Sequence, residues 1–348
     1  MNFVKKPGIP SFLLCLLSIG GFGMSEAKAH SEGKARNEGK ADNTANARPL
    51  TDTVKEGFRV VGYLPLGIDL YRTGMPDLGK ITHLNIAFLT PDSTGVFGDD
   101  EEVHMLTAAA HAKGVAVLLS IGGGDPPRYL KKLVGKRYQA AFVQALVALT
   151  ELYQCEGIDV DLEGDLIDGN YESFVKNLAV ALKAKKKLMT AAIATTYASH
   201  YTKAALAQFD FVNIMSYDKT GPWDKSDPGP HAPFSMATDD LAYWTRTRGL
   251  AVARITLGLP FYGYGFGRNA PESLSYGDIM QQFPAARNSD QLTVAGGGIV
   301  YYNGAATIRA KTALALQKAG GVMIWQLLQD APGPYSLLTA IDSLVKRR

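Results

Sequence analysis

Short aliphatic runs alternate with segments of helical period along most of the chain, and this alternation restricts the possible folds severely. Eight runs rich in β-branched and aliphatic residues occur after residue 57. They are Phe58–Leu64, Ile81–Phe88, Val115–Ile121, Gly157–Leu162, Leu188–Ala194, Phe211–Ser216, Arg254–Leu259 and Gly321–Leu327. Short, nearly continuous apolar runs are typical of strands that are buried on both faces.

Segments with helical period separate these runs. They are Glu101–Ala112, Lys136–Tyr153, Tyr171–Ala184, Ala204–Gln208, Asp239–Arg248, Ala306–Lys318 and a last one at Tyr335–Val345, with a poorly marked one between Tyr71 and Asp77. This alternation predicts an α/β protein with a (β/α)8 TIM barrel. A doubly wound sheet is the alternative, but no phosphate-binding glycine fingerprint follows the first run.

Three acidic residues, Asp159, Asp161 and Glu163, occupy alternate positions in the fourth run. The positions between them are aliphatic: Ile158, Val160 and Leu162. In a strand the three carboxyl groups therefore point to one face and the aliphatic side chains to the other. Like charges this close have coupled pKa values, and such groups are a common basis of acid–base catalysis.

A metal site and an exposed acidic strand are the alternative interpretations of this row. An exposed strand would not need so many flanking aliphatic side chains, and His/Cys ligand spacing is absent. In a TIM barrel, catalytic groups lie where strands end at their carboxyl side, which is the position of Glu163. The sequence therefore favours the catalytic interpretation of this row.

The first 29 residues have the layout of a secretory signal peptide. Lys5 and Lys6 precede an apolar stretch from Phe12 to Ile19, and Ala27-Lys28-Ala29 supplies small residues for cleavage. The apolar stretch is too short to span a bilayer. We therefore expect a secreted or periplasmic protein that is cleaved near Ala29, with no membrane span.

Two cysteines bear on this prediction. Cys15 would allow a lipoprotein, but it lies inside the apolar stretch and lacks small residues before it. Cleavage leaves Cys155 alone, so no intrachain disulfide can form, and a buried thiol is the expectation there. Residues 30–55 are poor in apolar side chains and are predicted to be a flexible tether, and 56–348 a single catalytic barrel.

The overall charge limits the partners that we expect. The formal net charge is +3, with 36 basic and 33 acidic residues. Nucleic acid is not favoured by so small an excess, whereas neutral polar substrates such as sugars are compatible with it. We expect a monomer, although the sequence does not fix the oligomeric state.

Other strand ends carry polar and aromatic residues that would meet the acidic row at one mouth of the barrel. Ser120 ends the third run, Tyr217 and Asp218 follow the sixth, and Trp325 lies in the eighth. Aromatic faces beneath sugar rings, with polar groups that fix orientation, are what a sugar-binding pocket requires.

With these residues in view, the chain resembles glycoside hydrolase family 18, the chitinase family. The family signature Asp-Gly-x-Asp-x-Asp-x-Glu is similar to Glu156–Glu163. The Ser-x-Gly-Gly motif resembles Ser120–Gly123, Met-x-Tyr-Asp resembles Met215–Asp218, and the Trp of the last strand resembles Trp325. The four motifs follow the family's order.

The chain departs from the family at three places. The first Asp of the signature is Glu156, at the start of the strand, where we expect little effect on chemistry. Tyr264 stands where the family often has an Arg that holds the sugar. Many chitinases insert a small α+β domain after the seventh strand, whereas Tyr264 to Gly304 is short and shows little strand pattern, so we expect no insertion domain.

The resemblance implies a retaining hydrolase of β-1,4-linked N-acetylglucosamine that uses substrate-assisted catalysis. It also implies that no metal and no organic cofactor is needed. Glu163 would be the general acid and base, Asp161 would orient the substrate acetamide, Asp159 would share a proton with Asp161, and Tyr217 would donate to the acetamide. Ser120, Gly122 and Gly123 would support them. The implied substrate-binding residues are Trp325, Met215, Asp218, Tyr63, Phe88 and Trp223.

The substrate class leaves alternatives open. Chitin and chitooligosaccharides compete with the diacetylchitobiose core of N-glycans, on which the protein would be an endo-β-N-acetylglucosaminidase. A non-catalytic chitin-binding lectin is the other class, since some family members have lost the acid. Retention of Glu163, Asp161 and Tyr217 disfavours the lectin.

Overall fold

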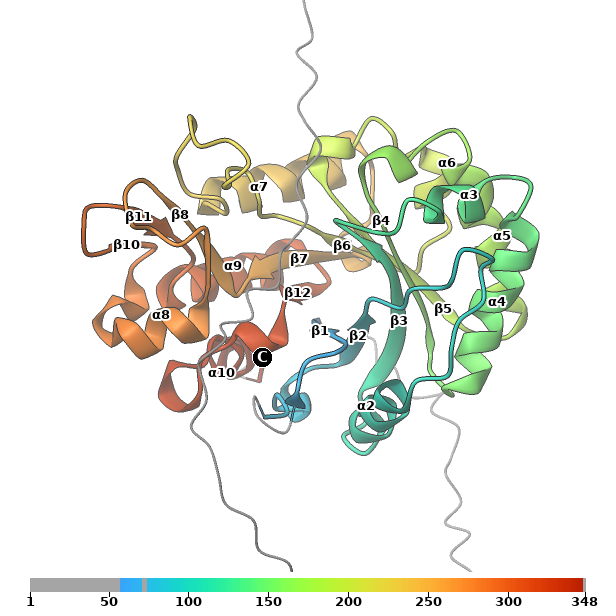
Figure 1. Cartoon of the computed structure of the whole chain (residues 1–348), viewed down its shortest axis with the longest axis horizontal. Coiled ribbons are helices and arrows are strands. Elements are labelled where there is room, and N and C mark those ends of the chain that lie inside the picture. The colour runs from blue at the N-terminus through green and yellow to red at the C-terminus, as the bar shows by residue number, and fades with distance from the viewer. Residues whose placement is uncertain (1–56, 71–73, 347–348) are drawn as a thin grey trace, which may run out of the picture.

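A closed barrel of eight parallel strands forms the centre of the protein (Figure 1). The structure is a computed structural model that describes residues 57–70 and 74–346. In chain order the barrel strands are β1 (Arg59–Pro65), β2 (His83–Ala87), β3 (Ala116–Gly123), β4 (Gly157–Leu162), β5 (Leu188–Ile193), β6 (Phe211–Ile214), β7 (Ile255–Pro260) and β12 (Gly321–Trp325). Strands β1 and β12 pair and close the barrel.

Helices surround the barrel and cover its aliphatic outer face (Figure 1). They are α2 (Glu101–His111), α3 (Leu130–Val134), α4 (Gln139–Leu152), α5 (Tyr171–Ala184), α6 (Lys203–Leu206), α7 (Phe234–Ala242), α8 (Tyr276–Gln282), α9 (Ala305–Lys318) and α10 (Leu337–Val345). Side-chain caps mark several starts: Asp100 accepts from the second residue of α2, and Ser336 accepts from Thr339 at the start of α10. The predicted (β/α)8 barrel is confirmed.

The predicted elements agree with the observed ones to within a few residues, with one larger difference. Helix α7 begins at Phe234, before the predicted Asp239, and continues into a π-helical turn at Tyr243–Thr247. Pro233 precedes it at the N-cap, where its fixed φ is tolerated. Part of the poorly marked first helix falls on residues 71–73, outside the described residues, and only a 3₁₀ turn at Leu78–Lys80 follows it.

A small antiparallel sheet lies between β7 and α9. It contains β8 (Tyr262–Phe266), β9 (Ser273–Ser275), β10 (Gln291–Thr293) and β11 (Ile299–Tyr301), in the order β10-β11-β8-β9, and lies with α8 at one side of the barrel (left in Figure 1). No separate insertion domain is evident among the described residues, as expected. The expectation of little strand structure there is wrong, since these four strands form a sheet. The sequence did not reveal them because three of the four have only three residues and show no readable alternation.

The interior of the barrel is polar at the level of Asp159 on β4. Side chains at inward positions of four neighbouring strands have no exposed surface: Asp159, Thr190, Asn213 and Thr256. The alternate residues of β4, Ile158 and Val160, point outward into the main hydrophobic cluster. The outer layer therefore supplies apolar burial, while the inner layer needs internal hydrogen bonds.

Several predictions concern residues outside this description. The signal peptide at 1–29 and the tether at 30–55 lie outside the described residues. Within residues 57–70 and 74–346, no helix is long and apolar enough to cross a bilayer. Cys155 is buried, and burial raises the pKa of its thiol to about 12, which makes it a protonated, apolar side chain.

Candidate active site

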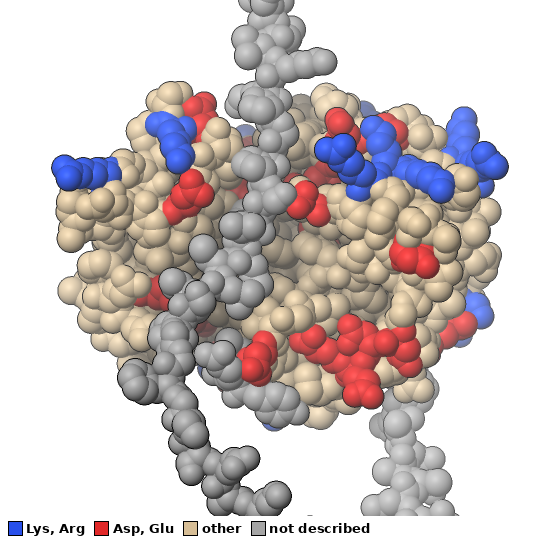
Figure 2. All heavy atoms as spheres, in the orientation of Figure 1, with Lys and Arg blue, Asp and Glu red and all other residues tan. Residues whose placement is uncertain are grey.

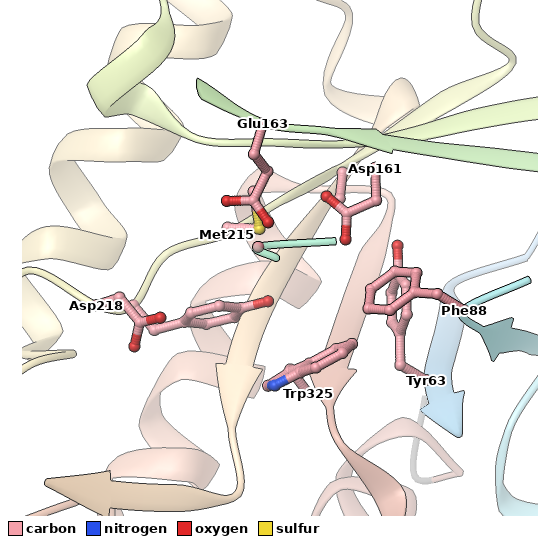
Figure 3. A pocket seen from close by; sticks show the side chains of 10 residues that line it. Tyr63, Phe88, Asp161, Glu163, Met215, Asp218 and Trp325 are labelled. Atoms are coloured by element: carbon pink, nitrogen blue, oxygen red, sulfur yellow. The ribbon is translucent and has the colours of Figure 1, made fainter. Parts of the chain in front are cut away.

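The acidic row of β4 faces the inside of the barrel and runs toward its mouth. Asp159 lies beside Ser120 of β3 and Asp161 beside Gly122, whereas Glu163 follows the last residue of the strand. Asp161 and Glu163 point into the same pocket, and Trp325 lies opposite them (Figure 3). The alternation read from the sequence thus places successive carboxyl groups at increasing height along one wall.

Asp159 lies deepest and is held by side chains from four strands. Its Oδ2 accepts hydrogen bonds from the hydroxyls of Tyr63 on β1 (2.7 Å) and Ser120 on β3 (2.8 Å). Its Oδ1 accepts from Thr190 on β5 (2.5 Å) and from Asn213 Nδ2 on β6 (3.4 Å). Burial raises the pKa of Asp159, and these donors oppose that rise by stabilising the carboxylate.

Asp161 is buried with far fewer partners. Its Oδ1 makes no hydrogen bond within the described part of the chain, although the residue lines the pocket. Burial raises the pKa of Asp161 well above its usual range, and the charges of Glu163 and Asp159 raise it further. Full ionisation of this row is therefore unfavourable, and the protonated form of Asp161 is favoured relative to that of a free carboxyl group.

Glu163 has a pKa suited to proton transfer near neutral pH. Burial raises its pKa to about 7, and the negative charge of Asp218 adds to the effect. A carboxyl group with that pKa is substantially protonated at pH 6 to 7 and can lose its proton in the same range. The side chain lines the pocket together with Asp161.

Tyr217 and Met215 follow β6 and form another wall of the pocket. Tyr217 is almost fully buried, and its hydroxyl contacts Met323 Sδ at 3.7 Å. Burial raises the pKa of Tyr217 well above its usual range, with further contributions from Asp161 and Asp218. Its hydroxyl is therefore a permanent hydrogen-bond donor beside the carboxyl groups.

Aromatic side chains from three strand ends form the floor of the pocket. Trp325, at the end of β12, stacks with Phe88 at 5.6 Å between ring centroids and 26° between planes. Trp325 also packs against Tyr63, with 5.5 Å between ring centroids. Tyr63 thus contacts both the aromatic floor and Asp159, a double role that the sequence did not indicate. A flat indole of this kind suits the apolar face of a sugar or a methyl group.

The two glycines that end β3 allow close packing around the acidic row. Gly122 has φ +106°, and a Cβ there would lie 2.1 Å from the carbonyl oxygen of Asp161. Gly123 has φ +83°, and its Cβ would lie 2.5 Å from the Phe88 ring. Side chains at either position would displace groups that border the pocket, which supports the predicted supporting role.

Asp218 and its neighbours extend the site away from β4. Asp218 lines the pocket with a left-handed backbone, φ +62°, and its Oδ1 accepts from the Tyr262 hydroxyl at 2.5 Å. His231 Nδ1 lies 3.3 Å from the same oxygen. Tyr264, which stands where the family often has Arg, is buried and packs edge-on against the rings of His231 and Trp223.

The structure brings most of the predicted residues to one pocket. The lining residues are Tyr63, Phe88, Gly124, Asp161, Glu163, Ala192, Met215, Tyr217, Asp218 and Trp325. Asp159 and Ser120 lie beneath this lining. Trp223 is not among the lining residues; it is partly buried and packs against Tyr264 at 5.5 Å.

Sequence reasoning missed several polar residues of this region. Thr190, Asn213 and Thr256 form a hydrogen-bonded layer around Asp159, with Thr256 Oγ1 donating to Asn213 Oδ1 at 2.6 Å. The sequence did contain a signal for these three residues, because each is a polar residue inside an aliphatic run. His231 and Tyr262 gave no such signal, because they belong to a loop and to a strand outside the barrel.

The far end of β4 differs from the site. Glu156 Oε2 accepts from the backbone N of Val117 (2.7 Å) and lies 3.1 Å from His111 Nε2. Glu156 thus ties the start of β4 to β3 and α2, away from the pocket.

Within residues 57–70 and 74–346, no cluster of three or more His, Cys, Asp or Glu side chains is placed to hold a metal ion.

The sequence pattern of the family described as Glycosyl hydrolases family 18 matches residues 59–330, which includes every barrel strand. The chain belongs to glycosyl hydrolase family 18. The family 18 resemblance that the motifs indicated is therefore confirmed.

Solved structures of this family share the fold. The family 18 chitinase ChiB from the chitin utilization locus of Flavobacterium johnsoniae is 34% identical, with 84% of this chain and 94% of that chain covered and a TM-score of 0.77. A chitinase from Bacteroides thetaiotaomicron is 25% identical, covers 82% of this chain and 96% of that chain, and gives 0.70. The chitinase-like agglutinin from Robinia pseudoacacia, at 22% identity and 0.70, shares the fold, with 81% of this chain and 98% of that chain covered.

Relatives found by sequence are more distant. An endochitinase of Brugia malayi is 24% identical over 343 residues, which cover 76% of this chain and 67% of that protein. The chain spans only 9% of the length of the probable chitinase 10 of Drosophila melanogaster and 60% of a chitinase-like effector of Moniliophthora roreri. The family supports a glycoside hydrolase, and it also includes proteins named as agglutinin or effector.

Proposed function

We propose that this protein is a secreted, retaining glycoside hydrolase that cleaves β-1,4-linked N-acetylglucosamine in chitin or chitooligosaccharides. The observation that carries the proposal is the convergence of Asp161 and Glu163, both with raised pKa values, on one pocket floored by Trp325. A sugar ring above an indole would have its anomeric side turned toward two carboxyl groups (Figure 3).

The first chemical step begins with Glu163. Its carboxylic acid protonates the glycosidic oxygen, and the bond from that oxygen to the anomeric carbon breaks. The carbonyl oxygen of the substrate's own 2-acetamido group attacks the anomeric carbon and forms a cyclic oxazolinium ion. Asp161 accepts a hydrogen bond from the acetamide N–H and stabilises the positive charge that develops there.

Asp159 assists Asp161 in this role, and Tyr217 assists the substrate acetamide. The four donors around Asp159 favour a carboxylate at that position, so the shared proton is favoured on Asp161 before substrate binds. As positive charge develops on the acetamide, Asp161 becomes the better carboxylate and its proton passes toward Asp159. Tyr217 donates its hydroxyl hydrogen to the acetamide oxygen and turns it toward the anomeric carbon.

The second step returns the catalyst to its starting state. Glu163, now a carboxylate, takes a proton from water, which attacks the anomeric carbon from the side that the leaving group vacated. The oxazolinium ring opens and the sugar keeps its anomeric configuration. Trp325 beneath the acetamide methyl, with Met215 and Asp218 at the sides, holds the ring in place through both steps.

The surface is compatible with a neutral polysaccharide. On the face shown in Figure 2, Lys and Arg side chains lie mostly toward the upper rim with Asp and Glu side chains among them, and a larger group of Asp and Glu side chains lies on the lower part. A nucleic-acid partner would need a continuous basic surface, which this face does not present.

Two incubations test the substrate class. The purified protein is given chitin oligomers in one and a high-mannose glycoprotein in the other, and products are identified by mass, with Glu163→Gln as the inactive control. We expect oligomer cleavage and an intact glycoprotein. Release of glycans would make the protein an endo-β-N-acetylglucosaminidase instead, and binding of chitin without any product would make it a lectin.

Substrate assistance has its own test. A thiazoline that mimics the oxazolinium should inhibit strongly, because it resembles an intermediate close to the transition state. Glucose oligomers should not be hydrolysed. If a 2-fluoro sugar instead leaves a covalent ester on Asp161, detected by intact-protein mass spectrometry, the acetamide is not the nucleophile.

Export is the last part of the proposal. It is supported by Lys5, Lys6 and the apolar stretch that precedes Ala27-Lys28-Ala29. N-terminal sequencing of protein recovered outside the cytoplasm should give a mature chain that starts at or near His30. Soluble protein that retains Met1 would exclude export, and a lipidated Cys15 would indicate a lipoprotein.

A further inference from the structure

His231 is a fully buried histidine behind the pocket, and the roles proposed above do not use it. Its side chain contacts Asp218, which lines the pocket, with 3.3 Å between Nδ1 and Oδ1. Its other ring nitrogen, Nε2, lies 3.2 Å from the backbone carbonyl oxygen of Tyr262. The ring packs against Tyr262 and Tyr264, at centroid distances of 4.9 and 5.0 Å.

Both ring nitrogens of His231 therefore face oxygen atoms that are natural acceptors. The carbonyl of Tyr262 can only accept, so Nε2 must carry a hydrogen. The Oδ1 atom of Asp218 already accepts from the Tyr262 hydroxyl at 2.5 Å. A second favourable contact at that oxygen is made when Nδ1 also carries a hydrogen, and an imidazole with hydrogens on both nitrogens is positively charged.

The backbone around His231 is fixed on both sides, so the ring is held in this position. The carbonyl oxygen of His231 accepts from the backbone N of Lys219 at 2.8 Å. The next carbonyl, that of Ala232, accepts from Lys311 Nζ on α9 (2.7 Å) and from Asn303 Nδ2 (2.9 Å). Lys311 and Asn303 also bond to each other, at 2.8 Å. The loop cannot move the ring away from Asp218 without breaking these buried hydrogen bonds.

The groups that face Asp218 come from several elements. Tyr217 belongs to the same loop, Tyr262 and Tyr264 to β8, and Glu163 follows β4. Burial raises the pKa values of the three tyrosines, so they remain neutral at physiological pH. Lys311 lies behind His231 and bonds to Ala232, not to Asp218. Among these neighbours of Asp218, His231 is thus the side chain in direct contact that can carry a positive charge.

We propose that His231 is a positioning residue that holds the Asp218 carboxylate through a hydrogen on Nδ1 and offsets part of the negative charge that Asp218 presents to Glu163. The inference rests on the proposed hydrolase function. Asp218, a charged loop residue at the pocket wall, is thereby in contact with a buried histidine and a buried tyrosine.

The test measures kcat, and the dependence of kcat/KM on pH, with a chitin oligosaccharide as substrate for two variants. His231→Leu removes both hydrogen and charge, and we expect kcat to fall about tenfold while the alkaline midpoint rises by about half a pH unit, because Asp218 then acts on Glu163 without compensation. His231→Asn keeps a donor near the position of Nδ1 but no charge. It should recover most of kcat and retain the raised midpoint.

The same substitutions in an Asp218→Asn background separate this role from a general structural one. If His231 acts through Asp218, His231→Leu should leave the midpoint of that background unchanged. His83→Leu is the matched control, because His83 is also buried but lies in β2 and contacts Thr82, away from the pocket. It should lower stability without moving the midpoint. A midpoint that stays at the wild-type value in both His231 variants, or that shifts equally without Asp218, would overturn the proposal.

A measurement on the wild-type protein does not depend on activity. With ¹⁵N-labelled histidine, NMR at pH 7 should show hydrogens on both ring nitrogens of His231, identified by the signal lost in His231→Asn. A bare Nδ1 would refute the proposal directly. Wild-type protein that cleaves no oligosaccharide but shows both hydrogens would instead refute the proposed function and leave the contact to Asp218 standing.

Discussion

Glu163 and Asp161 lie in the same pocket but differ in the groups that surround their carboxyl groups. The pKa of Asp161 is raised by burial and by two carboxyl neighbours, and one of its oxygens has no hydrogen-bond partner among the described residues. The pKa of Glu163 is raised by burial and Asp218, to about 7. In the proposed mechanism, Asp161 keeps its proton until charge develops on the substrate, and Glu163 exchanges its proton near neutral pH.

Replacing Glu163 by Gln should abolish turnover and leave the fold and sugar binding largely intact. Gln has nearly the same shape but cannot donate a proton to the leaving oxygen, so kcat should fall by about 10²–10⁴-fold or more. Steady-state kinetics and oligosaccharide binding measure the two effects. Glu156→Gln is the control at the opposite end of β4 and should keep its activity. A Glu163→Gln protein with more than a tenth of the wild-type rate would contradict the assignment.

The pH dependence of kcat/KM should follow the carboxyl group of Glu163. The first step of the proposed mechanism needs the protonated acid, so the rate should fall as pH rises through about 7. Asp218→Asn removes a negative charge that raises the pKa of Glu163, and the alkaline fall should then move to lower pH. Initial rates between pH 5 and 9 measure the shift. An unchanged midpoint would mean that Asp218 does not act on Glu163 electrostatically.

At the scale of elements, the contact between β3 and β4 sets the height of Asp161. Gly122 lies opposite Asp161, and its backbone approaches the carbonyl of that residue too closely for a side chain. The two strands therefore pack as they do because the third strand ends in glycine. A side chain at Gly122 would therefore displace the backbone at Asp161, a position that we propose to be catalytic.

Gly122→Ala should separate the two strands and reduce both stability and activity. The matched control is Gly114→Ala, since Gly114 also has positive φ (+69°) but a methyl group added there would meet no atom within 4 Å. The control should lose only the backbone contribution, about 1–2 kcal/mol. Gly122→Ala should lose more, and should also lower kcat. Urea unfolding and kinetics compare the two, and equal losses would show that the close approach is unimportant.

The sequence predicted the barrel and the acidic row because both depend on local alternation. Eight apolar runs and three carboxyl groups at alternate positions are visible without any knowledge of partners. The small sheet was not predictable in this way, because its three-residue strands are defined by pairing with β8 and not by their own composition. The contact of His231 with Asp218 likewise joins residues 13 apart through a loop without period.

At the scale of the whole molecule, Lys311 links α9 to the loop that carries Trp223. Lys311 has no exposed surface, and burial lowers the pKa of its amine to about 7, against the opposing effect of Asp290 and Asp240. Unfolding returns the amine to water, where its pKa is about 10.5. Between these two pH values the unfolded chain binds more protons than the folded one, so the free energy of unfolding gains from this group as pH rises.

Lys311→Met should reduce this pH dependence. From pH 7.5 to 9.5 the wild-type free energy of unfolding should rise relative to that of the variant, by at most about 1.4 kcal/mol per pH unit. Urea unfolding at several pH values gives the difference. Lys318→Met, on the exposed face of the same helix, is the control and should follow the wild type. Parallel curves for Lys311→Met would show that the amine is charged in the folded protein.

Asp159 accepts hydrogen bonds from four barrel strands, and one of them, β1, is closed only by pairing with β12 near the end of the chain. The pocket is therefore a product of ring closure. During refolding from urea, enzyme activity should return together with the last change in tryptophan fluorescence and never before it. A chain that ends before residue 325 would contain the acidic residues of β4 and should still be inactive. The return of activity therefore reports the final step of folding.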